Sequence, residues 1–156
     1  RCLPYYEVCE KIGAPVVFHT GENSGDDSCA KWNDPIYIAE IARKYPKLKI
    51  VITHYYWPKM DYCYEITKNL PNIYFEIAAM ADSEVVEKSG GIDKVKKILF
   101  KTILDRPDKV IFGTDWPMCK IEDHIKLIQS LHLDKTTESK VFYKNSEKLY
   151  GFNLNS

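Results

Sequence analysis

The sequence predicts an α/β fold in which helices cover a parallel sheet. Four short apolar runs alternate with segments of helical spacing, and this alternation is typical of parallel sheets. The runs are rich in β-branched residues on both faces, as in strands buried between layers. No Gly/Ser-rich linker, low-complexity tract or block of charge divides the chain. We therefore expect one domain over residues 1–156.

Each predicted strand ends at a residue that can bind a metal or move a proton. The strands are APVVF before His19, LKIVIT before His54, NIYF before Glu76 and KVIFGT before Asp115. The intervals from His19 to His54 and from Glu76 to Asp115 are about the length of one strand–helix unit. The interval between His54 and Glu76 is shorter and predicts a compact connection.

Helices are predicted before the first strand and between and after the strands. Their sequences are YYEVCEKIG, DPIYIAEIARKYP, YCYEITKNLP, GGIDKVKKILFKTILDRP, IEDHIKLIQSL and SEKLYGF. In the second helix, Asp34 is the expected N-cap and Pro35 takes the first helical position, while Pro46 ends it. Gly151 is expected to close the last helix.

Two of these helices have an apolar stripe in the sequence. In YCYEITKNLP the expected apolar positions are Tyr62, Ile66 and Leu70. In the longest helix the expected buried stripe, with lysines opposite, is Ile92, Val95, Ile98, Leu99 and Ile103.

Composition excludes several classes of function. The chain has 156 residues, 45% of them hydrophobic, enough for the core of one domain. Its 22 basic and 22 acidic side chains balance, so nothing in the charge favours a nucleic-acid or membrane-surface partner. No run approaches the roughly 18 apolar residues of a spanning helix. The five cysteines form no CxxC pair, so we expect reduced thiols in a cytoplasmic protein.

The polar strand ends are expected to converge. The carboxyl ends of parallel strands lie on one edge of the sheet, where ligands bind in such folds. His19, His54 and Asp115 would then face one site, and the small Gly113 would leave room below Asp115 for a ligand. The alternative for FGTDWP is a simple turn, since Gly, Thr, Asp and Pro are turn residues. Because a polar residue follows each of the four predicted strands, a site is favoured over a simple turn.

Five motifs resemble the amidohydrolase-related family. They are HTG from His19, VITH ending at His54, NIYFEIA from Asn72, VIFGTDWP from Val110 and NSEKLYGF from Asn145. The likeness runs from about Pro15 to Phe152. The family consists of metal-dependent (β/α)8 TIM barrels and includes hydrolases and decarboxylases akin to aminocarboxymuconate-semialdehyde decarboxylase.

The resemblance implies a partial barrel. The family's first strand carries an HxH pair of metal ligands, which this sequence lacks. A complete barrel needs about 250 residues. We therefore expect the C-terminal half of a TIM barrel, strands five to eight with their helices, without the N-terminal half.

The resemblance also assigns roles. His19 would be the metal ligand of strand five, and Asp115 the metal ligand of strand eight and a catalytic proton acceptor. His54 would be the histidine of strand six, which in different members binds a second metal or acts directly on the substrate. As a catalytic residue it would polarise the substrate carbonyl or hold a substrate carboxylate. Imidazole and carboxylate suit a divalent metal, zinc above all, with a position left for water. The competing interpretations are a buried structural role for His19 and a merely hydrogen-bonded role for His54.

Other candidates lie beside these strand ends. The loop GENSGDDSCAKW suggests Asn23, Asp26, Asp27 and Trp32 as substrate contacts, although it could be a solvated loop. Trp57 and Trp116 are further candidates, and the run Tyr55–Trp57 could equally be a packing cluster. Glu76 is expected to be structural, and His124 and His132 to be surface or capping residues. Cys29 and Cys119 are not expected to be nucleophiles.

The expected function is hydrolysis of a small amide, ester or lactone through a water activated by the metal. One alternative is non-oxidative decarboxylation of a small unsaturated or aromatic acid. Another is a catalytically inactive half-barrel that acts as an assembly partner. The expected partners are a small-molecule substrate and either the missing N-terminal half of the barrel or a second copy of the chain.

Overall fold

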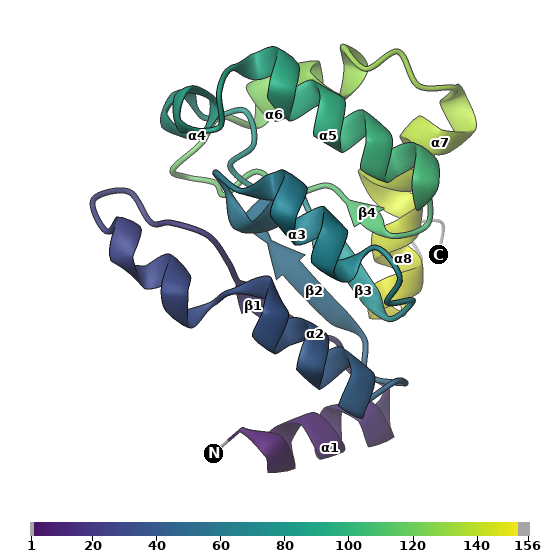
Figure 1. The fold of residues 1–156 in the computed structure, drawn as a ribbon. Coiled ribbons are helices and arrows are strands. Elements are labelled where there is room, and N and C mark those ends of the chain that lie inside the picture. Colours follow the sequence, from purple (N-terminus) through teal and green to yellow (C-terminus); the bar gives the residue numbers. More distant parts are fainter. Residues whose placement is uncertain (1, 153–156) are drawn as a thin grey trace.

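The computed structural model describes residues 2–152 and is built around one parallel sheet (Figure 1). Four strands follow one another in chain order across this sheet: β1 (Val16–His19), β2 (Ile50–Thr53), β3 (Ile73–Glu76) and β4 (Val110–Ile111). His19 is opposite Thr53, and Glu76 is opposite Ile111. The predicted α/β fold with parallel strands is confirmed, and all strand carboxyl ends share one edge.

Helices connect the strands. They are α1 (Leu3–Ile12), α2 (Pro35–Lys44), α3 (Met60–Thr67), α4 (Ser83–Lys88), α5 (Ile92–Asp105), α6 (Ile121–Gln129), α7 (Lys135–Ser139) and α8 (Asn145–Tyr150). Short turns of other helix types are η1 (Asp27–Trp32), η2 (His54–Tyr56) and η3 (Lys140–Lys144). The short helices α4 and α7 were not predicted; each begins after an aspartate N-cap, Asp82 and Asp134.

The main core lies between the sheet and the helices on one face. In Figure 1, α2 and α3 lie across that face, and α8 lies on the other side near β4. A smaller cluster on this second side joins Leu149 of α8 to Val51 and Ile111. The sheet is thus covered on both faces at its centre. The edge strand β1 is less covered, since Val17 is 51% exposed.

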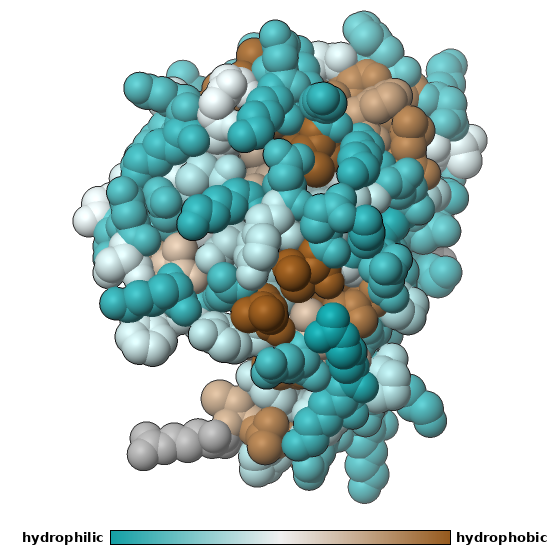
Figure 2. Space-filling view, in the orientation of Figure 1, coloured by the Kyte–Doolittle hydropathy of each residue, from teal (hydrophilic) through white to brown (hydrophobic). Residues whose placement is uncertain are grey.

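The helix boundaries largely follow the predicted signals. The Asp34 side chain accepts a hydrogen bond from the Ile36 backbone N–H at 2.9 Å, and Pro35 opens α2. Gly151 closes α8 with a φ of 74°, a conformation that favours glycine. Figure 2 shows that hydrophilic side chains cover most of this view of the molecule, with apolar residues in small patches.

The predicted apolar stripe agrees with the buried face in α5 but not in α3. In α5, the stripe is buried except for Ile92, which is 39% exposed because it is the first residue of the helix. In α3 the buried residues are Met60, Cys63, Tyr64 and Thr67, and Ile66 is only half-buried. Leu70 lies beyond the end of the helix, where it packs against the core. Tyr62 lies at the surface instead, where its hydroxyl donates to Asp34 at 3.0 Å.

The last strand is shorter than predicted. Only Val110 and Ile111 pair with β3, and the chain then leaves the ladder. The Phe112 backbone N–H donates instead to the Val141 carbonyl in η3, at 3.0 Å. Asp115 therefore stands on a loop and not directly on a strand.

The prediction of a surface position was wrong for His124 and confirmed for His132. His124 is fully buried in α6, and its Nε2 accepts from the Ala81 backbone N–H at 3.3 Å. This bond ties α6 to the loop after β3. His132 is exposed. Over residues 2–152 we find no helix that combines the length and the apolar character needed to cross a membrane.

Candidate functional site

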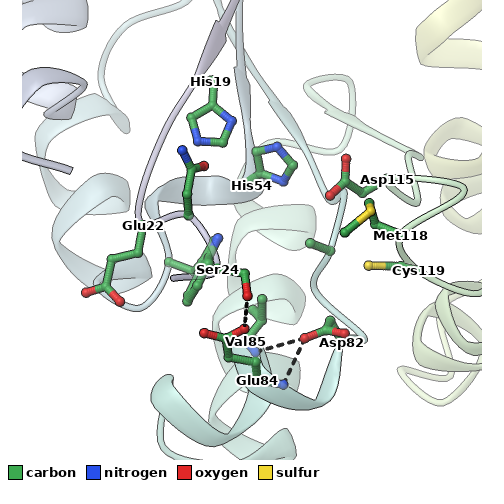
Figure 3. Close-up of a pocket in the computed structure, with 13 residues that line it drawn as sticks. His19, Glu22, Ser24, His54, Asp82, Glu84, Val85, Asp115, Met118 and Cys119 are labelled. Carbon is green, nitrogen blue, oxygen red and sulfur yellow. Dashed lines mark hydrogen bonds between the residues drawn. The ribbon is translucent and has the colours of Figure 1, made fainter. Parts of the chain in front are cut away.

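His19, His54 and Asp115 line one cavity at the carboxyl edge of the sheet (Figure 3). The cavity has a volume of about 240 Å³. The other residues that line it are Glu22, Asn23, Ser24, Trp57, Ala79, Asp82, Glu84, Val85, Met118 and Cys119. The expected convergence of three strand ends is therefore present, and the fourth end, Glu76, lies outside the lining.

The two histidine rings lie side by side. Their centroids are 4.7 Å apart and their planes are tilted by 59°. His54 Nδ1 is 3.3 Å from the Ala78 carbonyl oxygen. A carbonyl can only accept a hydrogen bond, so Nδ1 must be the donor. In the neutral ring, Nε2 then keeps a free lone pair.

The backbone around His54 has an unusual conformation. His54, Tyr55 and Tyr56 have φ values of 59°, 49° and 56°. Left-handed backbone costs about 1–2 kcal/mol for each residue other than glycine. Burial offsets this cost, since Tyr55 is fully buried. Its ring packs at a tilt against Phe75, with ring centroids 4.8 Å apart, and its hydroxyl shares a hydrogen bond with the Thr102 hydroxyl. Such strained residues concentrate at functional sites.

Gly21, the glycine of HTG, permits the close approach of the loop after β1 to this turn. A Cβ at Gly21 would lie 2.6 Å from the Trp57 carbonyl oxygen, and the residue has a φ of 88°. The Glu22 backbone N–H donates to the same carbonyl at 3.1 Å. Any larger residue at position 21 would push the two loops apart.

Asp115 occupies the other side of the cavity, on the loop after β4. It too has left-handed backbone, with a φ of 67°. The prediction that Gly113 leaves space for a ligand was wrong. A Cβ there would overlap the Glu76 carboxyl group, so the side chain of Glu76 fills that space.

The surroundings shift three pKa values near the cavity. Burial and the neighbouring His19 lower the pKa of His54, and Asp115 only partly opposes this. His54 is consequently neutral near pH 7. Burial and then Asp115 raise the pKa of Glu76. Burial, Asp82 and Asp115 raise the pKa of Cys119 to about 11, which leaves a protonated, poorly nucleophilic thiol, as expected.

The residues present fit part of a divalent-metal site. Neutral imidazole and carboxylate are good donors to zinc and to manganese, and His19, His54 and Asp115 supply both kinds. Within residues 2–152, however, no three His, Cys, Asp or Glu side chains are grouped closely enough to hold a metal ion. The donor chemistry is suitable, and the number of ligands is incomplete.

The predicted substrate contacts divide into two groups. Asn23 and Trp57 line the cavity. Asp26 does not, because its carboxylate accepts from the Ser28 N–H at 3.0 Å and caps η1. Trp32 and Trp116 are also absent from the lining and are 79% and 72% exposed. The exposed Asp27 carboxylate contacts Lys88 at 2.6 Å.

Helix α4 and the segment before it also contribute to the cavity, which was not predicted from the sequence. Asp82 and Glu84 line the cavity, and both come shortly after β3, where the rule of carboxyl ends could have indicated them. The Ser24 hydroxyl donates to the Glu84 carboxylate at 2.8 Å. Lys88 contacts the carboxylates of both Glu84 and Glu22, at 3.3 and 3.2 Å. These contacts join the loop after β1 to α4.

The sequence of this chain is similar to those of known proteins. A family model described as amidohydrolase matches residues 3–152. A curated relative, L-rhamnono-gamma-lactonase from Scheffersomyces stipitis, is 24% identical, and the match covers 71% of this chain and 43% of that protein.

Solved structures extend the comparison. An uncharacterized TIM-barrel protein from Bordetella bronchiseptica is 22% identical with a TM-score of 0.74, covering 97% of this chain and 50% of that one. A dihydroxybenzoic acid decarboxylase from Polaromonas, with bound manganese and an inhibitor, has 19% identity, a TM-score of 0.62, and coverage of 98% and 54%. An amidohydrolase from Burkholderia multivorans with bound zinc has 13% identity, a TM-score of 0.69, and coverage of 94% and 55%.

These likenesses establish the fold. The chain spans about half the length of the proteins it matches. Its four parallel strands with their helices correspond to half of a TIM barrel, as the sequence predicted.

Proposed function

Since the chain belongs to the amidohydrolase family, we propose that it carries half of the active site of a metal-dependent hydrolase. The substrate would be a small lactone, ester or amide. One observation carries the proposal: His19, His54 and Asp115, from the ends of three different strands, line one cavity. Two imidazoles and a carboxylate at the carboxyl edge of half a TIM barrel are suited to metal-assisted hydrolysis.

A lactone is the preferred substrate within this class. The curated relative is a lactonase. The cavity lining also includes Glu22, Asp82 and Glu84, and none of the described residues that line it is Lys or Arg. Lys88 pairs with Glu22 and Glu84 and only partly offsets the charge of the three carboxylates, so the lining still disfavours a substrate carboxylate and accepts hydrogen bonds from hydroxyl groups. An uncharged lactone with hydroxyl groups suits this lining better than an acid does.

His19 and Asp115 would hold the metal, with the remaining ligands supplied from outside the described residues. A divalent cation bound there lowers the pKa of water and polarises a carbonyl group. Asp115 would accept the proton of the attacking water and pass it to the leaving group. This role requires an ionised carboxylate that can reach into the cavity.

His54 would act as an acceptor. Its Nδ1 proton is engaged by the Ala78 carbonyl, so Nε2 is left to accept a hydrogen bond from water or from a substrate hydroxyl. The roles expected from the sequence, polarising the substrate carbonyl or holding a substrate carboxylate, need a proton on Nε2. The hydrogen bond to Ala78 and the lowered pKa of His54 favour the acceptor role instead.

The second half of the barrel is part of the proposal. The described residues supply too few ligands for a metal site, and the edge strand β1 leaves Val17 half-exposed. We propose that another four strand–helix units complete the barrel, in the same polypeptide or from a second copy of this chain. An unpaired strand edge also promotes self-association of the chain alone.

Decarboxylation of a small aromatic acid is the second candidate. The manganese-containing decarboxylase from Polaromonas matches 98% of the chain with a TM-score of 0.62. His19 and Asp115 would hold the metal as before, and the substrate acid would bind at that metal. The loss of carbon dioxide would need no attacking water. The acidic lining of the cavity places this candidate after the lactonase.

An assay of both reactions tests the proposal. The chain alone and the longest product of the gene that contains it are stripped with a chelator and restored with zinc or manganese. Each is given a panel of sugar lactones, simple esters, amides and hydroxybenzoic acids. We expect metal-dependent opening of a lactone by the longer product and little activity from the chain alone.

The outcomes separate the alternatives. Release of carbon dioxide from a hydroxybenzoic acid, without lactone opening, would contradict the hydrolase and favour the decarboxylase. No turnover of any substrate by the metal-loaded longer product would contradict both reactions and favour an assembly role. Elemental analysis after dialysis checks that the metal is present, because an incomplete ligand set should lose it.

A further inference from the structure

We infer that Thr20 is a positioning residue of the site, which holds the turn that carries His54 against the strand end that carries His19. Thr20 follows His19 directly, and its side chain is fully buried. No role in the site was expected for it from the sequence. Thr20 does not line the cavity, so it would act through the histidines and not on the substrate.

The hydroxyl group of Thr20 contacts the turn on both sides of His54. It donates to the carbonyl of Thr53, the residue before His54, at 2.6 Å. It accepts from the backbone N–H of Tyr56, the second residue after His54, at 2.9 Å. One buried group thus satisfies a carbonyl and an N–H that the left-handed turn removes from the regular ladder.

A reciprocal bond fixes the two strand ends to one another. The Thr53 hydroxyl donates to the Phe18 carbonyl of β1 at 3.1 Å. Thr53 therefore joins β1 to β2 without touching the turn, whereas Thr20 joins β1 to the turn itself. This difference provides a matched control, because both residues are buried threonines at neighbouring strand ends.

The consequence for the site is geometric. The His19 and His54 rings can stay 4.7 Å apart only if the left-handed turn keeps its place against β1. Without the Thr20 hydroxyl, the Thr53 carbonyl and the Tyr56 N–H lose a buried partner. Unsatisfied buried polar groups are costly, so we expect the turn to move toward solvent. A displacement of about 1 Å can reduce the rate about a hundredfold.

The test compares Thr20→Val, Thr20→Ser and Thr53→Val by NMR. Valine keeps the shape of threonine without the hydroxyl, and serine keeps the hydroxyl without the methyl group. The readouts are the nuclear Overhauser effect between the His19 and His54 ring protons and the exchange rate of the Tyr56 amide. Neither readout depends on catalysis.

We expect Thr20→Val to weaken the ring contact and to accelerate exchange of the Tyr56 amide by about tenfold or more relative to buried amides of β3. Thr20→Ser should restore both. Thr53→Val should lower the melting temperature and leave both readouts near the parent. If Thr20→Val does not fold, Thr20→Cys replaces it, because a thiol of similar size is a weak hydrogen-bond donor.

Two results would overturn the inference. One is a Thr20→Val (or Thr20→Cys) protein with the parent ring contact and the parent Tyr56 exchange. The other is a Thr20→Ser protein that behaves like Thr20→Val, because the methyl group and not the hydroxyl would then matter.

The role in catalysis rests on the proposed function and has its own measurement. In the active protein, Thr20→Val should lower kcat about tenfold or more with KM within about threefold, and Thr20→Ser should recover it. Absence of hydrolysis in the parent would contradict the proposed function and leave the NMR result standing. Unchanged kcat in Thr20→Val with an active parent would overturn only the role in catalysis.

Discussion

The cavity has two sides that the protein holds in different ways. The histidine side, residues 19–22 and 53–57, rests on two neighbouring strands and a buried layer of aromatic side chains. The aspartate side, residues 112–119, follows a strand of only two residues. Trp116 and Met118 there are 72% and 79% exposed.

The hydrogen bonds differ in the same way. On the histidine side, buried hydroxyl groups cross from strand to strand and from strand to turn. On the aspartate side, short local bonds close the loop, such as those from the Met118 and Cys119 N–H groups to the Asp115 carbonyl. Stability should therefore depend mainly on the histidine side. Asp115, which we propose as the proton acceptor, stands on the more exposed side.

The largest expected effect is on stability, at Tyr55. Tyr55→Ala removes a fully buried aromatic ring beneath His54 and should lower the free energy of unfolding by about 3–5 kcal/mol. Met118→Ala, on the exposed aspartate side, should change it by less than about 0.5 kcal/mol. Urea denaturation measures both. Equal losses in the two variants would remove the distinction between the two sides.

The next effect is on catalysis, at Asp115. Asp115→Asn keeps the size of the side chain and removes its basicity, so the active protein should lose at least about a hundredfold in kcat, or about 2.7 kcal/mol of barrier. Its free energy of unfolding should hardly change, since asparagine also tolerates left-handed backbone.

Asp134→Asn is the control for Asp115→Asn. Asp134 caps α7 through the Thr136 and Thr137 N–H groups, and asparagine is an equally good cap. Its kcat should match the parent. An Asp115→Asn enzyme within about threefold of the parent would show that Asp115 is a turn former and not a proton acceptor.

These two sides also differ in how far the sequence predicted them. The strand ends and their common edge followed from the spacing of apolar runs, because parallel strands leave few choices of arrangement. The left-handed turn at residues 54–56 could not be predicted, since HYYW contains no glycine to indicate it. Its stability comes from long-range contacts, such as those of Tyr55 with Phe75 and Thr102.

Two predictions that the structure contradicts failed for a related reason. Gly113 indicated free space, but the occupant of that space, Glu76, comes from the neighbouring strand. His124 was predicted to lie at the surface of a helix, but its partner, the Ala81 backbone N–H, comes from the loop after β3. Short-range patterns place the backbone and do not show which side chains meet.

A smaller effect is expected in the pH dependence of stability, through His54 on the histidine side. Burial and His19 lower the pKa of His54 in the folded protein below its unfolded value of about 6.5. Between these two values, the unfolded chain binds more protons, so the free energy of unfolding rises as the pH rises through that window. It falls as the pH falls toward the lowered pKa.

His54→Gln should flatten this dependence, and thermal melts at several pH values measure it. His132→Gln, at an exposed histidine, should leave the dependence as in the parent. The same slope in both variants would mean that His54 does not titrate as its surroundings require.

The smallest expected effect is at Lys88, which joins the loop after β1 to α4. Its ammonium group contacts the carboxylates of Asp27, Glu22 and Glu84 at 2.6, 3.2 and 3.3 Å. Lys88 and Asp27 are exposed, and Glu22 and Glu84 are partly exposed. Exposed ion pairs contribute little to stability and are screened by salt. Lys88→Met should therefore lower the melting temperature slightly at low salt, and the difference should vanish near 1 M salt.

Lys97→Met is the matched control, since Lys97 is an exposed lysine for which no ion pair is found among residues 2–152. Its melting temperature should not depend on salt differently from the parent. In the active protein, Lys88→Met should raise KM by no more than about threefold, because the loop it holds lines the cavity without carrying the proton. If Lys88→Met reduced kcat as much as Asp115→Asn, the loop would take part in the chemistry, and the division of the cavity into a supporting side and a reacting side would be wrong.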